Sequence, residues 1–249
     1  MAEPLRLYGL KALVTSAASG IGEAVARTLV KHGADVLAVD GLNSGVDQHF
    51  SAVRGIEGMT ATLTDARQMP ALVETAVEKL GGLDILINEF PLQPSEPIAG
   101  KGTEFDDLLK TRTDLILSLC RGALPHIKKS PAGRIINIGF LRSVFAAGAG
   151  SARDHAEKNL ADVTRALAVE IGEFGINANY VQPGAIMTAA SREVFRKDMQ
   201  LRDHCIASSA ARRLGEPVDV AKVVLFLASD DAVFVSGTGI AVDGGRTAD

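Results

Sequence analysis

The change of hydrophobic period between Arg134 and Glu170 constrains the fold of this chain more than any other feature. A short β-branched apolar run is formed by Ile135, Ile136 and Ile138, which is typical of a strand covered on both faces in a parallel sheet. From about Ser151, apolar residues recur at spacings of three and four and charged residues stand between them, which predicts an amphipathic helix. In sheets of this kind a ligand binds beyond the carboxyl ends of the strands. We therefore expect residues 139–158 to lie where a reaction would take place.

The rest of the chain repeats this alternation of strand and helix. Strands are predicted at 12–14, 36–39, 59–63, 83–88 and 174–181, and helices from the end of the 15–22 loop to about His32, after Asp65 and over 105–127. The pattern predicts an α/β fold: one Rossmann-like, doubly wound domain over residues 1–249, with a seven-stranded, mainly parallel sheet and helices on both faces. A length of 249 residues with 47% hydrophobic content is enough for one large core.

Charge and composition exclude several classes of function. The formal net charge is -4 and no basic run is longer than Lys128–Lys129, so no nucleic-acid partner is expected. The N-terminus has no apolar stretch long enough for a signal peptide or a membrane span, so we expect a cytoplasmic protein without a membrane partner. Cys120 and Cys205 lack the spacing of metal ligands, and no metal site is predicted.

A glycine-containing turn joins the first strand to the first helix. Such a turn places backbone N–H groups and the positive end of a helix at a diphosphate. The candidate cofactor-binding residues here are Thr15, Ser16, Gly20, Ile21 and Gly22. The same glycines would also serve close packing of helix on strand, so the loop by itself leaves both interpretations open.

Asp40 ends the second predicted strand. An acidic side chain at this place accepts hydrogen bonds from ribose hydroxyls and repels a 2′-phosphate. Any dinucleotide is therefore expected to be NAD rather than its phosphorylated form. The alternative interpretation of Asp40 is a solvated acid in a turn.

The glycine loop, a Pro183–Gly184 turn and the C-terminal Val242–Gly245 segment together resemble the short-chain dehydrogenase/reductase family over nearly the whole chain. In that family the fifth strand ends in Asn-x-Ser-Ser, a Tyr follows the catalytic Ser by about thirteen residues, and a Lys lies four beyond the Tyr. The resemblance makes Lys158 the only retained member of this catalytic set. It puts Asp154 at the Tyr position, and Phe140 or Leu141 at the Ser position according to where one extra loop residue is placed.

Further family positions also differ. The catalytic Asn of the family falls on Arg112 or Thr113, with Arg112 as our assignment. Ser16 replaces the first loop Gly, Thr62 replaces an adenine-binding Asp, and Glu89-Phe90-Pro91 replaces Asn-Ala-Gly. By resemblance, the cofactor site also includes Asn88, Lys158, Pro183, Gly184 and Thr188, and residues 189–213 form a variable lid. The replacements predict that NAD binding is weak or absent.

These losses favour a non-catalytic subunit that assembles with an active, homologous NAD-dependent alcohol dehydrogenase or ketoreductase in a heterotetramer. A homotetramer is the other arrangement that the resemblance implies. The alternative function is an active NAD-dependent oxidoreductase of a hydroxyacyl or keto substrate, with His155 or Asp154 as a non-standard acid. Minor alternatives are a protein similar to halohydrin dehalogenases and a ligand sensor.

Overall fold

A single parallel sheet forms the centre of the molecule. The computed structural model describes residues 6–90, 97–147 and 149–245. Within these residues the strands are β1 (Lys11–Thr15), β2 (Asp35–Asp40), β3 (Ile56–Thr60), β4 (Ile85–Asn88), β5 (Arg134–Ile138), β6 (Asn177–Pro183) and β7 (Gly239–Val242). Their order is β3-β2-β1-β4-β5-β6-β7, and every neighbouring pair is parallel. The expected doubly wound α/β fold is confirmed, with a sheet that is wholly parallel.

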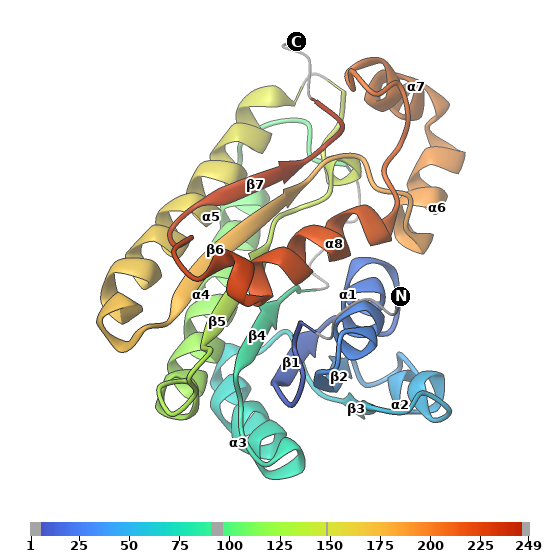
Figure 1. Ribbon diagram of the computed structural model, residues 1–249. Coiled ribbons are helices and arrows are strands. Elements are labelled where there is room, and N and C mark those ends of the chain that lie inside the picture. The colour runs from blue at the N-terminus through green and yellow to red at the C-terminus, as the bar shows by residue number, and fades with distance from the viewer. Residues whose placement is uncertain (1–5, 91–96, 148, 246–249) are drawn as a thin grey trace.

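Helices cover both faces of this sheet (Figure 1). They are α1 (Gly20–Lys31), α2 (Val46–Phe50), α3 (Met69–Leu80), α4 (Thr103–Ile127), α5 (Gly150–Ile171), α6 (Ala189–Lys197), α7 (Met199–Ala207) and α8 (Pro217–Ala228). Local sequence features determine where several of these helices begin or end. Pro217 occupies the first turn of α8, and Gly81 ends α3 in the left-handed conformation at φ 73°.

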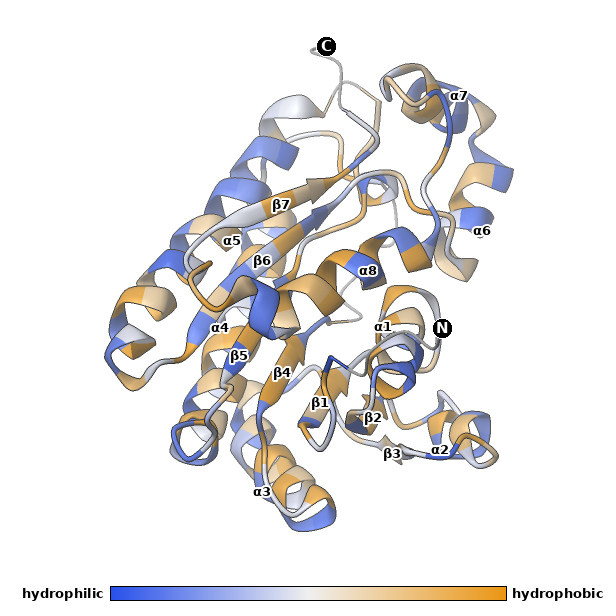
Figure 2. Ribbon diagram, viewed as in Figure 1, coloured by the Kyte–Doolittle hydropathy of each residue, from blue (hydrophilic) through white to orange (hydrophobic). Residues whose placement is uncertain are grey.

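The two faces carry separate hydrophobic cores. Even-numbered β1 residues such as Ala12 and Val14 pack with α1, α2 and α8, whereas Leu13 packs with α3, α4 and α5. Because successive side chains of a strand point to opposite faces, each strand supplies both cores. Figure 2 shows the consequence as apolar central strands with polar residues on the outer faces of the helices.

The third and sixth predicted strands differ most from the observed ones. The third was expected at 59–63 but β3 ends at Thr60, because its pairing follows β2, whose last residue Asp40 is paired with Thr60. The sixth was expected from Phe174, but 172–174 is a 3₁₀ turn followed by Gly175 at φ 73°. β6 instead extends to Pro183, where it pairs with Val242 of β7.

A buried chain of amide hydrogen bonds holds β4, β5 and α5 together below the carboxyl edge of the sheet. Asn88 Nδ2 donates to Asn137 Oδ1 at 2.8 Å, and Asn137 Nδ2 donates to Thr164 Oγ1 at 2.9 Å. All three residues are buried. The chain therefore fixes α5 relative to the strand ends through groups that water does not reach.

We predict that Thr164→Val destabilises the protein, because it leaves the buried Asn137 amide without its acceptor. The expected loss in free energy of unfolding is about 1–3 kcal/mol, the usual penalty for an unsatisfied buried polar group. Urea unfolding followed by circular dichroism measures it. Thr75→Val on the exposed surface of α3 is the matched control, with an expected change within about 0.5 kcal/mol. Equal stability of the two variants would contradict this role of the amide chain.

Candidate active site

A cavity of about 380 Å³ lies beyond the carboxyl ends of β5, β6 and β7. The first turns of α5 and the helices α6 and α7, which form the expected lid segment, stand around this end of the sheet (Figure 1). Its lining includes Phe140, Arg142, Phe145, Arg153, Glu157, Pro183, Gly184, Ile186, Cys205, Ser208 and Asp243. This is the position at which a doubly wound sheet binds its ligand.

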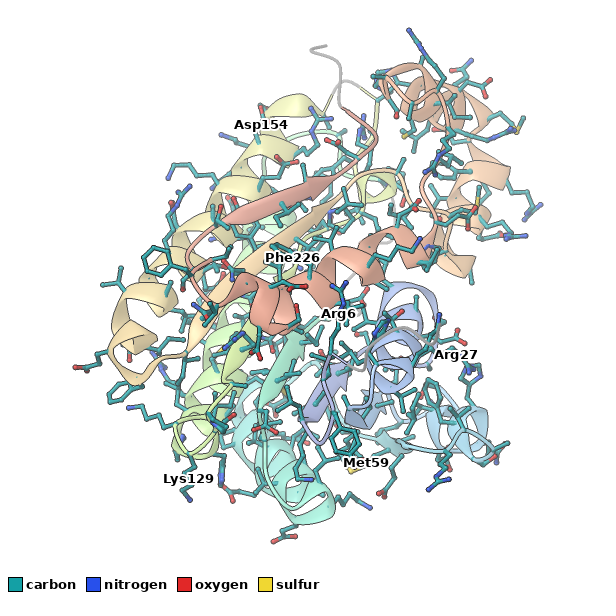
Figure 3. The ribbon with its side chains drawn as sticks, viewed as in Figure 1. Arg6, Arg27, Met59, Lys129, Asp154 and Phe226 are labelled. Carbon is teal, nitrogen blue, oxygen red and sulfur yellow. The ribbon has the colours of Figure 1, made fainter. Side chains whose placement is uncertain are left out.

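The structure changes which residues of α5 belong to this site. Arg153 and Glu157 line the cavity, and Arg153 is only 6% exposed. Asp154 and Lys158 lie on the outer side of the helix, with side chains 61% and 72% exposed. Lys158 forms an ion pair with Asp162 on the same helix, and Figure 3 labels Asp154 at the end of α5 where the helix begins.

A shift of one residue accounts for this difference. Counting thirteen residues from Phe140, rather than from Leu141, reaches Arg153, and four more reach Glu157. Phe140, Arg153 and Glu157 all line the cavity, whereas Leu141 packs among apolar neighbours. The assignment of Asp154 and Lys158 to the site is therefore corrected to Arg153 and Glu157, because one residue of α-helix turns a side chain by about 100°.

Arg112, which the family resemblance assigned to the Asn position, packs against Phe140 in the cavity wall. Its Nη2 donates to the Ile138 carbonyl, and its guanidinium lies 4.1 Å from the centroid of the Phe140 ring. Burial lowers the pKa of Arg112 to about 10. Thr113, the other residue considered for this position, instead donates from Oγ1 to Asn159 Oδ1 at 3.1 Å.

His155 does not line the cavity. It is half-buried, and its ring meets the Phe105 ring edge-on with the centroids 5.8 Å apart. Neither acid that the sequence proposed, His155 or Asp154, is brought to the cavity. Glu157 is the carboxylate that the structure places there, and sequence reasoning missed it because it counted from the retained Lys158.

The glycine loop has the backbone conformation expected of a close turn. Gly20, at the start of α1, has φ 63°, and a Cβ on Gly22 would lie 2.2 Å from the Ser16 carbonyl oxygen. Ile21 is buried in the core. Ser16 adopts φ 52°, a left-handed conformation that costs about 1–2 kcal/mol for a residue with a Cβ. The loop thus retains the shape of a glycine turn even though its first glycine is replaced.

Glu89 lies between this loop and Arg112. Thr15 and Ser16 donate from their hydroxyls to the Glu89 carbonyl oxygen, and Gly22 N–H donates to the Glu89 carboxyl group. The residue as a whole is partly exposed, but its Oε2 atom is buried and has no hydrogen-bond partner within the described part of the chain. Burial raises the pKa of Glu89 to about 8; Asp40 acts in the same direction, and the charge of Arg112 opposes it.

These residues fit a dinucleotide when Glu89 is protonated. Asp40 stands at the end of β2, where its two carboxylate oxygens accept the Ala18 and Gly41 N–H groups at 2.7 and 2.6 Å. At the other end of the loop, an ionised Glu89 would repel a diphosphate at the helix terminus, whereas the neutral acid can donate to it. Below about pH 8, protonated Glu89 and the N–H groups of the loop can therefore donate hydrogen bonds to a phosphate, and Asp40 can accept hydrogen bonds from a ribose.

The remaining predicted cofactor residues have structural partners of their own. Asn88 is buried in the amide chain, and Thr188 caps α6 by accepting the Ser191 N–H at 3.0 Å. Pro183 and Gly184 line the cavity, and Gly184 lets the chain pass close to Asp243, since a Cβ there would lie 2.6 Å from the Asp243 Cα. Thr62 follows β3 outside regular structure, and Pro91 lies outside the described residues.

Comparison with known proteins decides the family. A family model described as enoyl-(acyl carrier protein) reductase matches residues 16–247. The chain belongs to the short-chain dehydrogenase/reductase family. It is 33% identical to a 3-oxoacyl-[acyl-carrier-protein] reductase of Vibrio cholerae, over 97% of this chain and 98% of the relative. It is 31% identical to human dehydrogenase/reductase SDR family member 4, over 94% and 86%. It is 29% identical to the D-beta-hydroxybutyrate dehydrogenase of Rhizobium meliloti, over 95% and 98%.

These relatives contradict the interpretation of the chain as a non-catalytic subunit. Relatives at about 30% identity over nearly their full length are named as 3-oxoacyl-[acyl-carrier-protein] reductases, and others are named as dehydrogenases. The alternative function, an oxidoreductase, agrees with them. The expectation of a pseudoenzyme rested on the absence of Ser and Tyr, and it took no account of the carboxylate at 157.

The described residues contain neither a membrane-spanning helix nor a cluster of metal ligands. No described helix is both long enough and apolar enough to cross a membrane. Within the same residues, no group of three or more His, Cys, Asp or Glu side chains is arranged to hold a metal ion.

We predict that Glu89→Gln removes a pH dependence from folding stability. The folded protein keeps a proton on Glu89 up to about pH 8, whereas the unfolded chain releases it near the ordinary carboxyl value of 4.5. Between these values the folded state binds the extra proton, so the stability of the native protein falls as pH rises. Urea midpoints measured from pH 5 to 9 should show a smaller fall for Glu89→Gln.

The matched control is Glu170→Gln on the exposed face of α5. This variant should keep the pH profile of the native protein. Identical profiles for all three proteins would show that Glu89 does not retain its proton in the folded state.

Proposed function

We propose that this chain is an NAD-dependent oxidoreductase that interconverts keto and hydroxyl groups on an acyl substrate. The observation that carries the proposal is the Glu157 carboxylate, which lies in the cavity beside Phe140 in a chain whose full-length relatives are named as reductases and dehydrogenases. When bound, the nicotinamide supplies or accepts a hydride.

Glu157 carries the proton in this proposal. Reduction of a carbonyl adds a hydride to carbon and a proton to oxygen, so a group that donates a proton must lie in the cavity. Arg153 cannot serve, because a guanidinium does not release its proton in proteins. Among the former candidates, Asp154 faces outward and His155 packs against Phe105. Glu157 is the acid in reduction and the base in oxidation.

Asp40 supports NAD as the cofactor. Its carboxylate stands at the end of β2 and is held by two backbone N–H groups, in the position that favours ribose hydroxyls over a 2′-phosphate. The expectation of weak or absent binding is replaced by this proposal, and association with a homologous subunit stays a prediction.

We predict that the protein binds NADH and discriminates against NADPH. Fluorescence titration at pH 7 should give at least tenfold weaker binding of NADPH, because a phosphate placed beside Asp40 is repelled. Asp40→Ala should reduce this preference. No binding of either dinucleotide at millimolar concentration would overturn the proposed function.

We predict that Glu157→Gln lowers kcat for reduction of ethyl 3-oxobutanoate by NADH. A loss of about 10²–10⁴ is the usual contribution of a general acid, and KM should change little because the amide keeps the size of the side chain. Glu173→Gln, at an exposed position after α5, is the matched control. A Glu157→Gln variant with native kcat would assign the proton to another group.

A further inference from the structure

The cavity extends from one face of the sheet to the other. Its lining includes Arg153 and Glu157 of α5 and also Asp219 and Val223 of α8. These two helices contribute to different hydrophobic cores, so they cover opposite faces of the sheet. In Figure 1, α8 crosses in front of the sheet and α5 lies behind it. The cavity therefore passes over the carboxyl ends of β6 and β7, between the two helices.

The reacting group of a substrate belongs at the α5 end of this cavity. Glu157, to which we assign the proton, lies there, together with Arg142 and Arg153. An apolar tail gains little beside three ionisable side chains, because their contact with water is lost without replacement. The remainder of an acyl substrate is therefore expected to extend away from α5.

Apolar side chains form the wall at the α8 end. Ile186, Val223 and Val242 line the cavity there, together with Ala241 of β7, which is the edge strand of the sheet. Val223 and Val242 are half-buried and pack against the hydrophobic core on the α8 face. Contact with an apolar ligand would remove their remaining surface from water, which is favourable.

The charged groups at the α8 end already have partners within the protein. Asp219 pairs with Arg213 at 3.0 Å and accepts the Glu216 N–H at 3.0 Å. Asp243 accepts the Gly245 N–H at 3.0 Å. An alkyl chain can lie beside these groups without competing for their hydrogen bonds. An anionic tail, in contrast, would be repelled by two carboxylates.

Two glycines line the cavity without adding a side chain to it. A Cβ on Gly184 would lie 2.6 Å from the Asp243 Cα, and a Cβ on Gly215 would lie 2.6 Å from the Ile186 Cδ1. Close packing thus excludes a side chain at both positions. The space of about 380 Å³ is left open to an extended chain that passes over the strand ends.

We infer that the acyl substrate carries an uncharged alkyl tail, which lies over the carboxyl ends of β6 and β7 and ends against Ile186, Val223 and Val242. Ligand sites commonly combine such an apolar wall with a few polar groups that fix the orientation. Val223, on the wall opposite α5, limits the length of the tail. The position of the carbonyl rests on the proposed function, whereas the tail site requires only binding.

The test measures how affinity depends on tail length. Calorimetry on the full chain without dinucleotide would compare ethyl 3-hydroxybutanoate, ethyl 3-hydroxyhexanoate and ethyl 3-hydroxyoctanoate. Each addition of two methylene groups should tighten binding about tenfold, as burial of those groups predicts.

A larger side chain at Val223 should shorten the tail that fits. Val223→Phe should weaken binding of the octanoate at least about tenfold and change binding of the butanoate less than about twofold, because only the longer tail reaches this wall. Val218→Phe is the matched control, since Val218 lies on the same helix, is 45% exposed and does not line the cavity. This variant should keep the native series of affinities.

Equal affinity of the native protein for the three esters, or no binding of any, would overturn the inference, as would an octanoate affinity that Val223→Phe leaves unchanged. If Val223→Phe fails to fold, Ala241→Leu on the exposed edge strand and the native series decide it. Length-dependent binding that Val223→Phe abolishes, without reduction of any of the matching 3-oxo esters by NADH, would support the tail site and remove the oxidoreductase. Reduction of these esters with no length dependence in binding or in kcat/KM would remove the inference and keep the proposed function.

Discussion

The packing of α5 against the sheet is the constraint on which the site depends. Ala152, Ala156, Leu160 and Leu167 are buried, and Thr164 accepts a hydrogen bond from Asn137 of β5. Apolar burial holds one stripe of the helix inward, and the buried hydrogen bond sets its rotation, since a slip would leave an amide unsatisfied. With the rotation set, Arg153 and Glu157 reach the cavity, and Asp154 and Lys158 face outward.

Buried charged groups lie in two separate regions, one beside the glycine loop and one in the cavity. In the loop region, Glu89 lies between Gly22 and Arg112, and burial keeps its proton on to about pH 8. In the cavity, Arg142 and Arg153 provide positive charge next to Glu157. Both regions lie at the carboxyl edge of the sheet, where strand ends and helix starts expose polar groups that the cores cannot accept. The proposed chemistry needs both, one to hold a dinucleotide and one to transfer the proton.

The strand pattern was predicted well where burial is continuous and less well where turns or edges intervene. The isoleucine run of β5 and the strands at 12–14 and 36–39 were found in place. β3 lies at the edge of the sheet and takes its length from β2, which the sequence of β3 does not encode. Phe174 looked like the start of a strand, but it is 43% exposed and lies under the Lys128 ammonium group. The identity of an apolar residue does not by itself show whether it lies in a turn or in a strand.

The doubly wound fold, the glycine turn before α1, the acid at the end of β2 and the edge of the sheet at which we expect a ligand were all readable from the sequence alone. These follow from local period and from the order of the elements, which a chain displays without being folded. Tertiary structure alone decided which face of α5 meets the cavity. Lys158 matched the family motif by identity, yet the match was one residue out of phase with the buried stripe. Counting the spacing of motif residues cannot detect a difference of about 100° in helix rotation. The packing of α5 against β5 and β6 determines this rotation.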